Sequence, residues 1–514
     1  MMTRKILSAT CCLFILSFIF IPCIAQAKLP NTEQNHEQIR QLWNQKKAQY
    51  IQRIKRTKDN TGILYDIQGE TNNLLKYAGY SHQYALLDEL ISLYLLSLDT
   101  LTETDPYLFS YFPGDSRVSV HRLNKKYRMW VGNQKPVGQE IIGNSAQFLY
   151  VLSEAVSIIS DIEKEKRTPI MKEALSKFVP LLLEHYNRWI FNTPGPFQVT
   201  GWGCRYNGES VSAVMNHQEF LTKKLDRKLG NGRSPSYCNV VDDTDMWIIA
   251  GVANILAVSK KEKGMVNMTS QEYGKLLNYV RMGANLLESR ITLTELKNFD
   301  GRRVFGAIFE QGALDGHPDH DHVGYTGPAF PDKISSNKVG YQGRGVGWDL
   351  SHARRFVHVF DALLKSRDIL DLDFPSKAVM KQMANQLVYA TFNRDFQKPL
   401  FTNFMDGTNG WYRVNYAGRP GFGYGPWDMS INVFDGGYGF WSIYNRDIKK
   451  VFSGFWDMIE SNDPAIRKHV AEHYEKNYWN QHARVSGVNF ENKNNPNTQS
   501  FLIQFMPSLY FMLR

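Results

Sequence analysis

The chain has 514 residues, of which 43% are apolar, 21% charged and 13% aromatic, and its formal net charge is +10. This composition excludes a disordered protein and predicts a large folded core. The basic charge favours acidic polymers such as uronate-containing glycans, or an anionic membrane surface, over nucleic acid, because no nucleic-acid recognition motif accompanies it. A generally basic proteome explains the charge equally well.

The first 27 residues are predicted to be a signal peptide. Arg4 and Lys5 form a positive region, an apolar run follows from Ile6 to Ile21, and Ala25-Gln26-Ala27 is a small-x-small cleavage site. We therefore expect an exported protein, periplasmic or secreted, that is cut before residue 28. No later stretch has the ~18–20 uninterrupted apolar residues of a membrane span.

Export changes what the cysteines can do. Of the five cysteines, only Cys204 and Cys238 follow the cleavage site. An oxidising compartment allows them to form a disulfide, but the sequence leaves open whether they do. Neither belongs to a CxxC motif, which disfavours a zinc–thiolate site.

The rest of the chain alternates predicted helices with loops. The polar stretch 31–56 predicts a leading surface helix, and we assign 28–63 to this lead and 64–514 to one helical domain. Apolar residues at helical spacing predict further helices at 64–77, 85–101, 138–162, 168–191, 209–224, 242–259, 271–290, 348–365, 376–393, 427–444, 448–459, 464–479 and 498–513. An alternating segment at 117–122 predicts a short strand. The stretch 298–347 has no predicted helix, and loops of that length are usually functional.

These predicted helices are of two kinds. Those at 168–191, 271–290, 376–393 and 464–479 have charged residues on one side and an apolar stripe on the other, which is typical of surface helices. Those that start near 138, 209, 242, 348, 427 and 498 follow long loops and carry little charge after their first turn. We therefore expect an all-α fold of helical hairpins, with outer and inner helices in alternation and the long loops at one rim.

Three loop-to-helix junctions carry the same residue types. Trp348-Asp349-Leu350-Ser351 recurs as Trp427-Asp428-Met429-Ser430, and Asp242-Asp243-Thr244-Asp245 precedes another tryptophan. Together with the two kinds of helix, these junctions resemble the six-hairpin (α/α)6 toroids of carbohydrate-active enzymes, over residues 64–513. The resemblance is one of architecture and carries no signature of a single family. It implies a toroid with its site at one rim and a glycan as the substrate.

Glycoside hydrolysis requires two carboxyl groups, and acids at the starts of inner helices would converge on one end of such a toroid. The candidate catalytic residues are Asp242, Asp243, Asp349, Asp428 and His352. The interpretation pairs Asp243 with Asp349 or Asp428 across the ring. Each of these acids also has a simpler explanation, because Asp commonly caps a helix.

Aromatic and basic residues near the same junctions are candidates for binding a sugar chain. The predicted substrate-binding residues are Trp348, Trp427, Arg354, His217, Asn216, Tyr325 and Glu310. Four of them support an alternative that the resemblance also implies. Polysaccharide lyases with a toroid fold use Asn, His, Tyr and Arg to neutralise a uronate and abstract its C5 proton, and Asn216, His217, Tyr325 and Arg354 supply these types.

The densest polar cluster is 310–322, where His317, Asp319, His320 and His322 are conceivable metal ligands. The cluster matches neither HExxH nor an EF-hand, so we expect no metal and interpret it as a loop that contacts substrate or as a solvated turn. The leading hypothesis is an exported glycoside hydrolase that acts on a glycan, acidic glycans included, through paired carboxylates. The alternatives are a toroid polysaccharide lyase, a non-catalytic glycan-binding or envelope-associated protein, and a metal-dependent hydrolase.

Overall fold

The computed structural model describes residues 32–104, 107–110, 119–122, 125–133, 140–192, 204–229, 236–317, 320–324, 344–414, 423–477, 484–485 and 487–512. It is mostly helical, and its strands are short and paired two by two in antiparallel ladders. The expectation of a predominantly helical protein is confirmed. No helix in the described ranges is long and apolar enough to cross a membrane.

The helices and strands have the following bounds. The helices are α1 Thr32–Lys55, α2 Gly62–Tyr80, α3 Tyr84–Ser97, α4 Ile142–Ser160, α5 Pro169–Phe191, α6 Val211–Val214, α7 His217–Leu225, α8 Asp243–Lys261, α9 Ser270–Glu288, α10 Leu350–Leu370, α11 Lys377–Asn385, α12 Ser430–Asp435, α13 Asp447–Ile459, α14 Pro464–His473 and α15 Pro496–Met512. The strands are β1 Thr102–Thr104, β2 Tyr107–Ser110, β3 Ser119–Arg122, β4 Tyr127–Met129, β5 Arg205–Tyr206, β6 Glu209–Ser210, β7 Ile291–Lys297, β8 Arg303–Phe309, β9 His322–Gly324, β10 Gly410–Tyr412, β11 Lys476–Asn477 and β12 Arg484–Val485.

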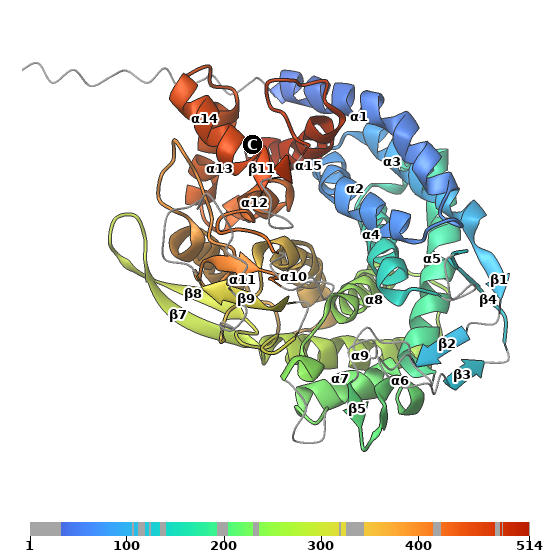
Figure 1. The fold of residues 1–514 in the computed structure, drawn as a ribbon. Coiled ribbons are helices and arrows are strands. Elements are labelled where there is room, and N and C mark those ends of the chain that lie inside the picture. Colours follow the sequence, from blue (N-terminus) through green and yellow to red (C-terminus); the bar gives the residue numbers. More distant parts are fainter. Residues whose placement is uncertain are drawn as a thin grey trace, which may run out of the picture.

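One set of helices surrounds the centre of the molecule (Figure 1). Helix α2 packs against α4, α4 against α8, α8 against α10, α10 against α12 and α12 against α15, and α15 packs against α2 again. Helices α4 and α8 are buried along nearly their whole length. A helix that is apolar on all sides is stable only when neighbours cover all of it, and these two have neighbours on both sides.

A second set of helices covers the first from outside. Helix α1 packs against α2, α3 and α15, helix α5 against α3 and α4, and helix α9 against α8. The leading helix α1 buries Ile39, Trp43, Tyr50 and Ile54 in the same continuous core as the central helices. Helix α9 buries only one face, as the charged and apolar sides of its sequence predict.

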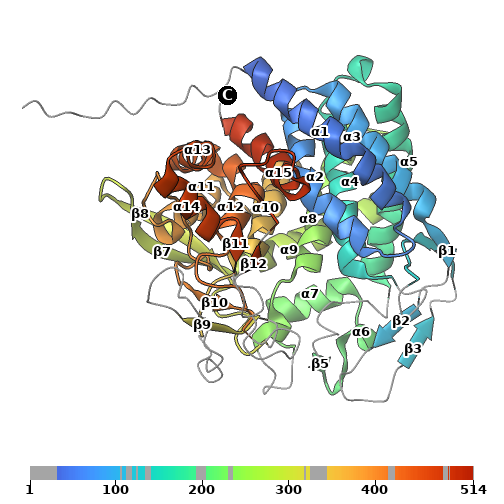
Figure 2. The same cartoon turned by 45° about the horizontal axis from the view of Figure 1, so that its top comes forward.

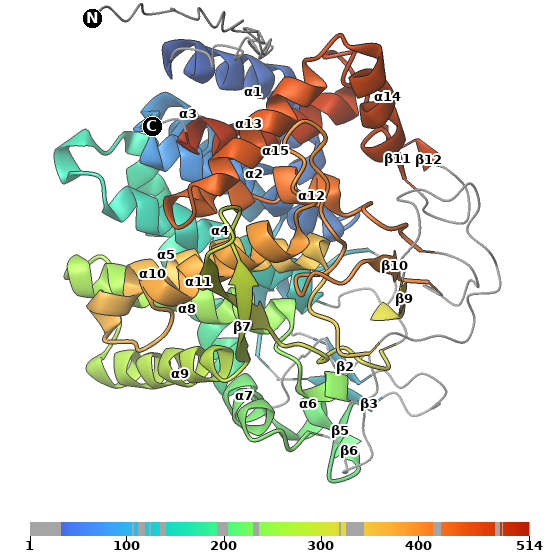
Figure 3. The same cartoon turned by 90° about the vertical axis from the view of Figure 1, so that its left-hand side faces the viewer.

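The connections differ in length at the two ends of the central helices. Short turns such as Ser81–Gln83 and 371–376 follow the carboxyl ends of α2 and α10, whereas long segments precede the amino ends of α8, α10, α12 and α15. The strands β2, β3, β5, β6 and β9 to β12 gather at that second end (Figures 2 and 3). The site residues must therefore be sought where the central helices begin.

Four predicted elements differ from the structure. One is 464–479, where α14 ends at His473 and Lys476–Asn477 form strand β11. The segment 209–224 forms a two-residue β-ladder and the short helices α6 and α7 instead of one helix, and 427–444 is broken at Gly436-Gly437, where Gly437 has φ +83°. The stretch 298–347 contains strand β8, which pairs with β7 over its whole length. These errors arise because a helical spacing of apolar residues does not reveal a local glycine break or a hairpin.

Candidate functional site

Asp242 begins helix α8 and belongs to a buried ion network. Its side chain accepts hydrogen bonds from the amides of Thr244 and Asp245, which makes it the helix cap. Its Oδ2 atom lies 3.1 Å from Nζ of the buried Lys224, which also contacts Asp245. Burial and the neighbouring Asp245 raise the pKa of Asp242. With every contact directed into the protein, Asp242 is placed to hold α8 in position.

His217, Asn216 and Glu310 belong to the same supporting layer. His217 Nε2 lies 2.9 Å from Oδ1 of Asp245, and Asn216 caps helix α7. Glu310 accepts the amide of Val241 with both oxygens, and burial raises its pKa to about 8 against the charge of Arg290. These three residues were predicted to bind substrate, but their partners lie within the protein, so the geometry gives them a supporting position.

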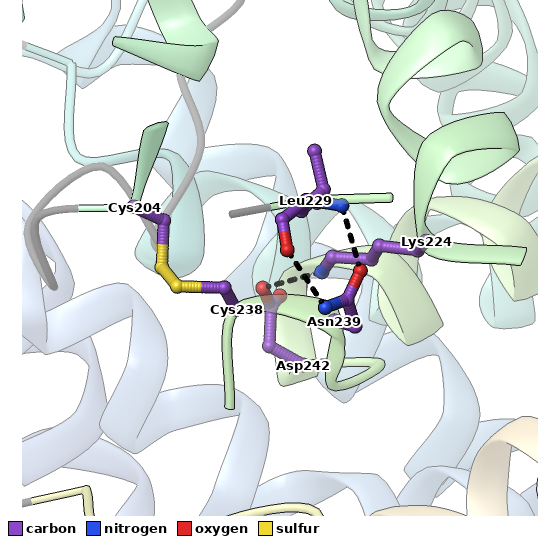
Figure 4. Close-up of a disulfide and its surroundings, with 6 residues drawn as sticks. All are labelled: Cys204, Lys224, Leu229, Cys238, Asn239 and Asp242. Carbon is purple, nitrogen blue, oxygen red and sulfur yellow. Dashed lines mark hydrogen bonds and ion pairs between the residues drawn. A yellow bond between two sulfur atoms is a disulfide. The ribbon is translucent and has the colours of Figure 1, made fainter. Parts of the chain in front are cut away.

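A disulfide closes the segment that supplies Lys224 (Figure 4). Cys204 and Cys238 are bonded, with Cα atoms 5.6 Å apart, so the open question of their pairing is settled for this structure. The neighbouring Asn239 donates to the carbonyl of Leu229 and accepts from its amide, both at 3.0 Å. The amide pair holds together the two ends of the 229–239 segment, directly before Asp242, and the disulfide ties Cys238 of that segment to Cys204.

Asp349 and His352 form a hydrogen-bonded pair at the start of helix α10. Asp349 caps the helix through the amides of Ser351 and His352, and its Oδ2 atom lies 2.8 Å from Nδ1 of His352. Burial opposes ionisation of Asp349, but the charge and hydrogen bond of His352 hold its pKa well below the ordinary range. In the neutral form of His352, an ionised Asp349 favours the tautomer with the proton on Nδ1, and Nε2 is then an acceptor.

Three residues surround this histidine from the loop side. Arg413 Nη2 lies 3.3 Å from Nε2 of His352, and the Tyr412 hydroxyl lies 3.4 Å from its Nδ1. The same hydroxyl lies 3.0 Å from Nδ1 of His320. Burial and the nearby His352 lower the pKa of His320 well below its ordinary value, so this ring is neutral. Only His352 of these residues was predicted as a catalytic group.

One buried residue, Asn403, holds together the loop that carries Tyr412 and connects it to α10. Asn403 donates to the carbonyls of Gly410 and Gly425, at 2.7 and 2.8 Å, and accepts from the amide of Met429. The backbone carbonyl of Asn403 accepts the amide of Leu350, at 2.9 Å, at the start of α10. Polar groups of this loop are thereby held over the amino end of the helix.

Asp428 and Trp427 lie on the same loop. Asp428 is buried and accepts the amide of Gly425, three residues before it, at 2.6 Å. Unlike Asp242 and Asp349 it caps no helix, because α12 begins after Met429 without a side-chain cap. Trp427 is half-buried, and its φ of +71° is unusual for a bulky residue. Strained conformations of this kind cluster at functional sites, which agrees with a role for Trp427 in substrate binding.

Asp243 faces a different partner from its neighbour. Its Oδ2 atom lies 2.6 Å from an Nη atom of Arg355, which also donates to the Tyr65 hydroxyl at 2.7 Å. The Asp243 side chain is 19% exposed, whereas Asp242 and Asp349 are buried. Among the predicted acids, Asp243 therefore has a carboxylate that a ligand can reach.

A small polar cavity, which we call the axial cavity, lies one to two helical turns from the amino ends of α8 and α10. Its volume is about 20 Å³, which is room for about one water molecule. It is lined by residues of α2, α8, α10 and α12 and the residue that follows α12, namely Gln68, Gly69, Asn73, Trp247, Arg354, Arg355, His358, Asp435 and Gly436. Asn73 Oδ1, Trp247 Nε1, His358 Nδ1 and Asp435 Oδ1 have no hydrogen-bond partner within the described part of the chain.

Asp435 is the acid of this cavity. Its Oδ1 atom lies 3.9 Å from Nη1 of Arg354, and burial raises its pKa to about 6 against the opposing charge of that arginine. A carboxyl group with this pKa keeps its proton up to about pH 6 and can donate it. Arg354, which was predicted to bind substrate, lies beside this acid.

Asp435 was not among the predicted residues. The segment 427–444 was interpreted as one helix, so Asp435 occupied a mid-helix position with no reason to face a cavity. The Asp435-Gly436-Gly437 sequence was the available signal, because two consecutive glycines commonly end a helix. Tyr412, Arg413 and Arg355 were missed because no local pattern links them to His352 or Asp243.

The remaining predicted residues lie elsewhere. Trp348 is only 3% exposed and packs against Phe309 and Phe356, so the prediction that it stacks on a sugar ring does not fit its position in the core. Tyr325 and Asp319 lie outside the described residues. Within the described ranges, no group of three or more His, Cys, Asp or Glu side chains is arranged to hold a metal ion.

Two acids with different surroundings thus lie beside consecutive arginines of α10. Asp435 lies beside Arg354, and Asp243 lies beside Arg355. Above them lies the Asp349–His352 pair with Arg413. This set can transfer protons and can bind anionic or hydroxyl-rich groups. Comparison of the chain with models of protein families, with curated proteins and with solved structures found no match.

Proposed function

We propose that this protein is an exported glycoside hydrolase with an (α/α)6 toroid fold. The closed succession of packing contacts from α2 through α15 supports the toroid, with α1, α3, α5, α9, α11 and α13 as its outer helices. The predicted signal peptide and the disulfide support export. The long loops at the amino ends of the central helices would then surround the entrance to the site.

One observation carries the choice of reaction: Asp435 is a half-buried acid with a raised pKa, and it lines a cavity in which four polar atoms have no hydrogen-bond partner among the described residues. In hydrolysis, protonated Asp435 gives its proton, through the one water molecule for which the axial cavity has room, to a glycosidic oxygen at the rim as the bond to the anomeric carbon breaks. Asp243, ion-paired with Arg355, is the second carboxylate of the pair. It accepts a proton from the attacking water or attacks the anomeric carbon itself. The predicted partners of Asp243, namely Asp349 and Asp428, are thus replaced by Asp435.

Arginines near the two acids favour a substrate with negative charge. Arg354 and Arg355 line the axial cavity and Arg413 contacts His352. A guanidinium group binds a carboxylate through two parallel hydrogen bonds, so a uronate-containing glycan suits this site. The half-buried Trp427 would pack against the apolar face of a sugar ring.

The pair Asp349–His352 favours a second candidate, a polysaccharide lyase. Asp349 orients His352 so that Nε2 accepts a proton, and Arg413 lies beside it. In β-elimination, such a base removes the proton at C5 of a uronate while an arginine neutralises the carboxylate. The bond between C4 and the leaving oxygen then breaks and a C4–C5 double bond forms.

A panel of neutral and uronate-containing polysaccharides separates these candidates. The proposed hydrolase releases reducing ends with no rise in ultraviolet absorbance, and Asp435→Asn and Asp243→Asn each lose this activity. A lyase releases an unsaturated product that absorbs in the ultraviolet, and His352→Ala should abolish the formation of this product. Sugar binding without turnover of any polysaccharide would instead identify a glycan-binding protein.

A further inference from the structure

A second, larger cavity opens at the opposite end of the central helices. Its volume is about 750 Å³, within the range of small-molecule sites. It is lined by the carboxyl ends of α2, α4 and α15, by the late α10 residue Lys365 and by adjoining turns, namely by Gly79, Tyr80, His82, Tyr84, Ile158, Asp161, Ile162, Glu163, Lys166, Lys365 and Phe511. Lys365 lies 13 residues after His352 on α10, so about 20 Å of helix separates this cavity from the candidate site. None of its residues takes part in the proposed reaction.

Aromatic side chains form one part of its wall. Tyr80, Tyr84 and Phe511 are half-buried rather than sealed in the core. The rings of Tyr80 and Phe511 are 5.6 Å apart, and the Tyr84 hydroxyl lies 3.4 Å from Nδ1 of His82. These rings offer flat apolar surface beside polar atoms, which suits a ligand with C–H groups on one face and hydroxyls at its edge.

The charges of the cavity cancel. Lys365 Nζ lies 3.3 Å from Oε1 of Glu154 and 3.3 Å from Oδ2 of Asp361, and it lies 4.5 Å from the centroid of the Tyr80 ring. At the mouth, the exposed Lys166 pairs with Glu163 at 3.0 Å. The lining therefore contains two lysines and two carboxylates, counting Asp161, and attracts neither anions nor cations preferentially.

From this combination we infer that the cavity is a binding site for a neutral sugar of one or two residues. The aromatic rings pack against the C–H face of the sugar, and Asp161 and Glu163 accept hydrogen bonds from hydroxyls. Lys166 and Lys365 donate to hydroxyl oxygens. The inference stands independently of the proposed hydrolase activity, because it uses none of the residues of that site.

The test is calorimetric titration with disaccharides in an Asp435→Asn background, where turnover is blocked. The neutral probes are cellobiose, maltose, lactose and N,N′-diacetylchitobiose. The charged probes are a glucuronate-containing disaccharide and de-acetylated chitobiose. We expect saturable binding of at least one neutral probe and a Kd at least tenfold weaker after Tyr84→Ala. Asp161→Arg, an exposed change at the mouth, should have a similar effect and does not disturb the core.

Two results would overturn the inference. One is that no neutral probe binds, or that a charged probe binds more tightly than the neutral ones and Tyr84→Ala weakens its binding. The other is an unchanged Kd in folded Tyr84→Ala and Asp161→Arg proteins, which would locate the binding elsewhere. Because the titration measures binding and not turnover, a protein that binds sugar here but degrades no polysaccharide contradicts only the proposed hydrolase activity.

Discussion

Asp242 and Asp243 are adjacent in the chain, yet their contacts predict opposite consequences of the same substitution. Asp242→Asn preserves a side chain that caps helices well and removes the charge facing Lys224. An unpaired buried charge costs about 3–5 kcal/mol, and because Asp245 still contacts Lys224 we expect about 2–3 kcal/mol of lost stability. Asp242→Ala also removes the cap, which adds about 1 kcal/mol.

Asp243→Asn retains an oxygen that can accept from Arg355, and its side chain is partly exposed. We therefore expect a smaller loss of stability, about 1 kcal/mol, together with a fall in kcat of about 100-fold or more. Urea unfolding followed by tryptophan fluorescence gives the stability, at a pH above the raised pKa of Asp242. Glycan degradation by the folded proteins gives kcat. If Asp242→Asn keeps full stability but loses activity, or Asp243→Asn keeps full activity, the assignment of these two residues is wrong.

Three further predictions follow from the contacts. Because burial raises the pKa of Asp435 to about 6 and a general acid must be protonated, kcat/KM should fall as pH rises through about 6, and a flat profile across this range contradicts that role. Replacing Cys204 and Cys238 together with Ala should cost about 4 kcal/mol, the chain-entropy value for their sequence separation of 34; an unchanged urea midpoint would argue against it. Trp348→Ala should lower the free energy of unfolding by about 3–5 kcal/mol, because the side chain lies in the core. Trp427→Ala should instead raise KM. The reverse pattern would contradict the placement of the two rings.

The positions of most helices could be predicted because their apolar spacing follows the helical period. The predicted helix 168–191 corresponds to α5 with Thr168 as its cap, and 271–290 corresponds to α9. The structure also confirms that Asp242 and Asp349 cap their helices. A cap requires only the two or three residues that follow it, so the sequence contains the necessary information.

The functional geometry could not be predicted in the same way. The contact of Arg413 with His352 joins residues that are 61 positions apart, and the axial cavity joins α2 with α8, α10 and α12. Such contacts depend on the packing of whole helices. Both copies of the repeated Trp-Asp motif lie at the amino ends of central helices, but Trp348 lies in the core and Asp428 is bound within its own loop.

The general-acid role of Asp435 is tested most directly by substrates whose leaving groups differ. A glycoside with a dinitrophenyl leaving group needs no proton to depart, whereas a natural glycan does. If Asp435 is the acid, Asp435→Asn should lower kcat about 100-fold or more on the glycan and leave cleavage of the activated glycoside nearly unchanged. Equal losses on both substrates, or no loss on the glycan, would contradict the proposed mechanism.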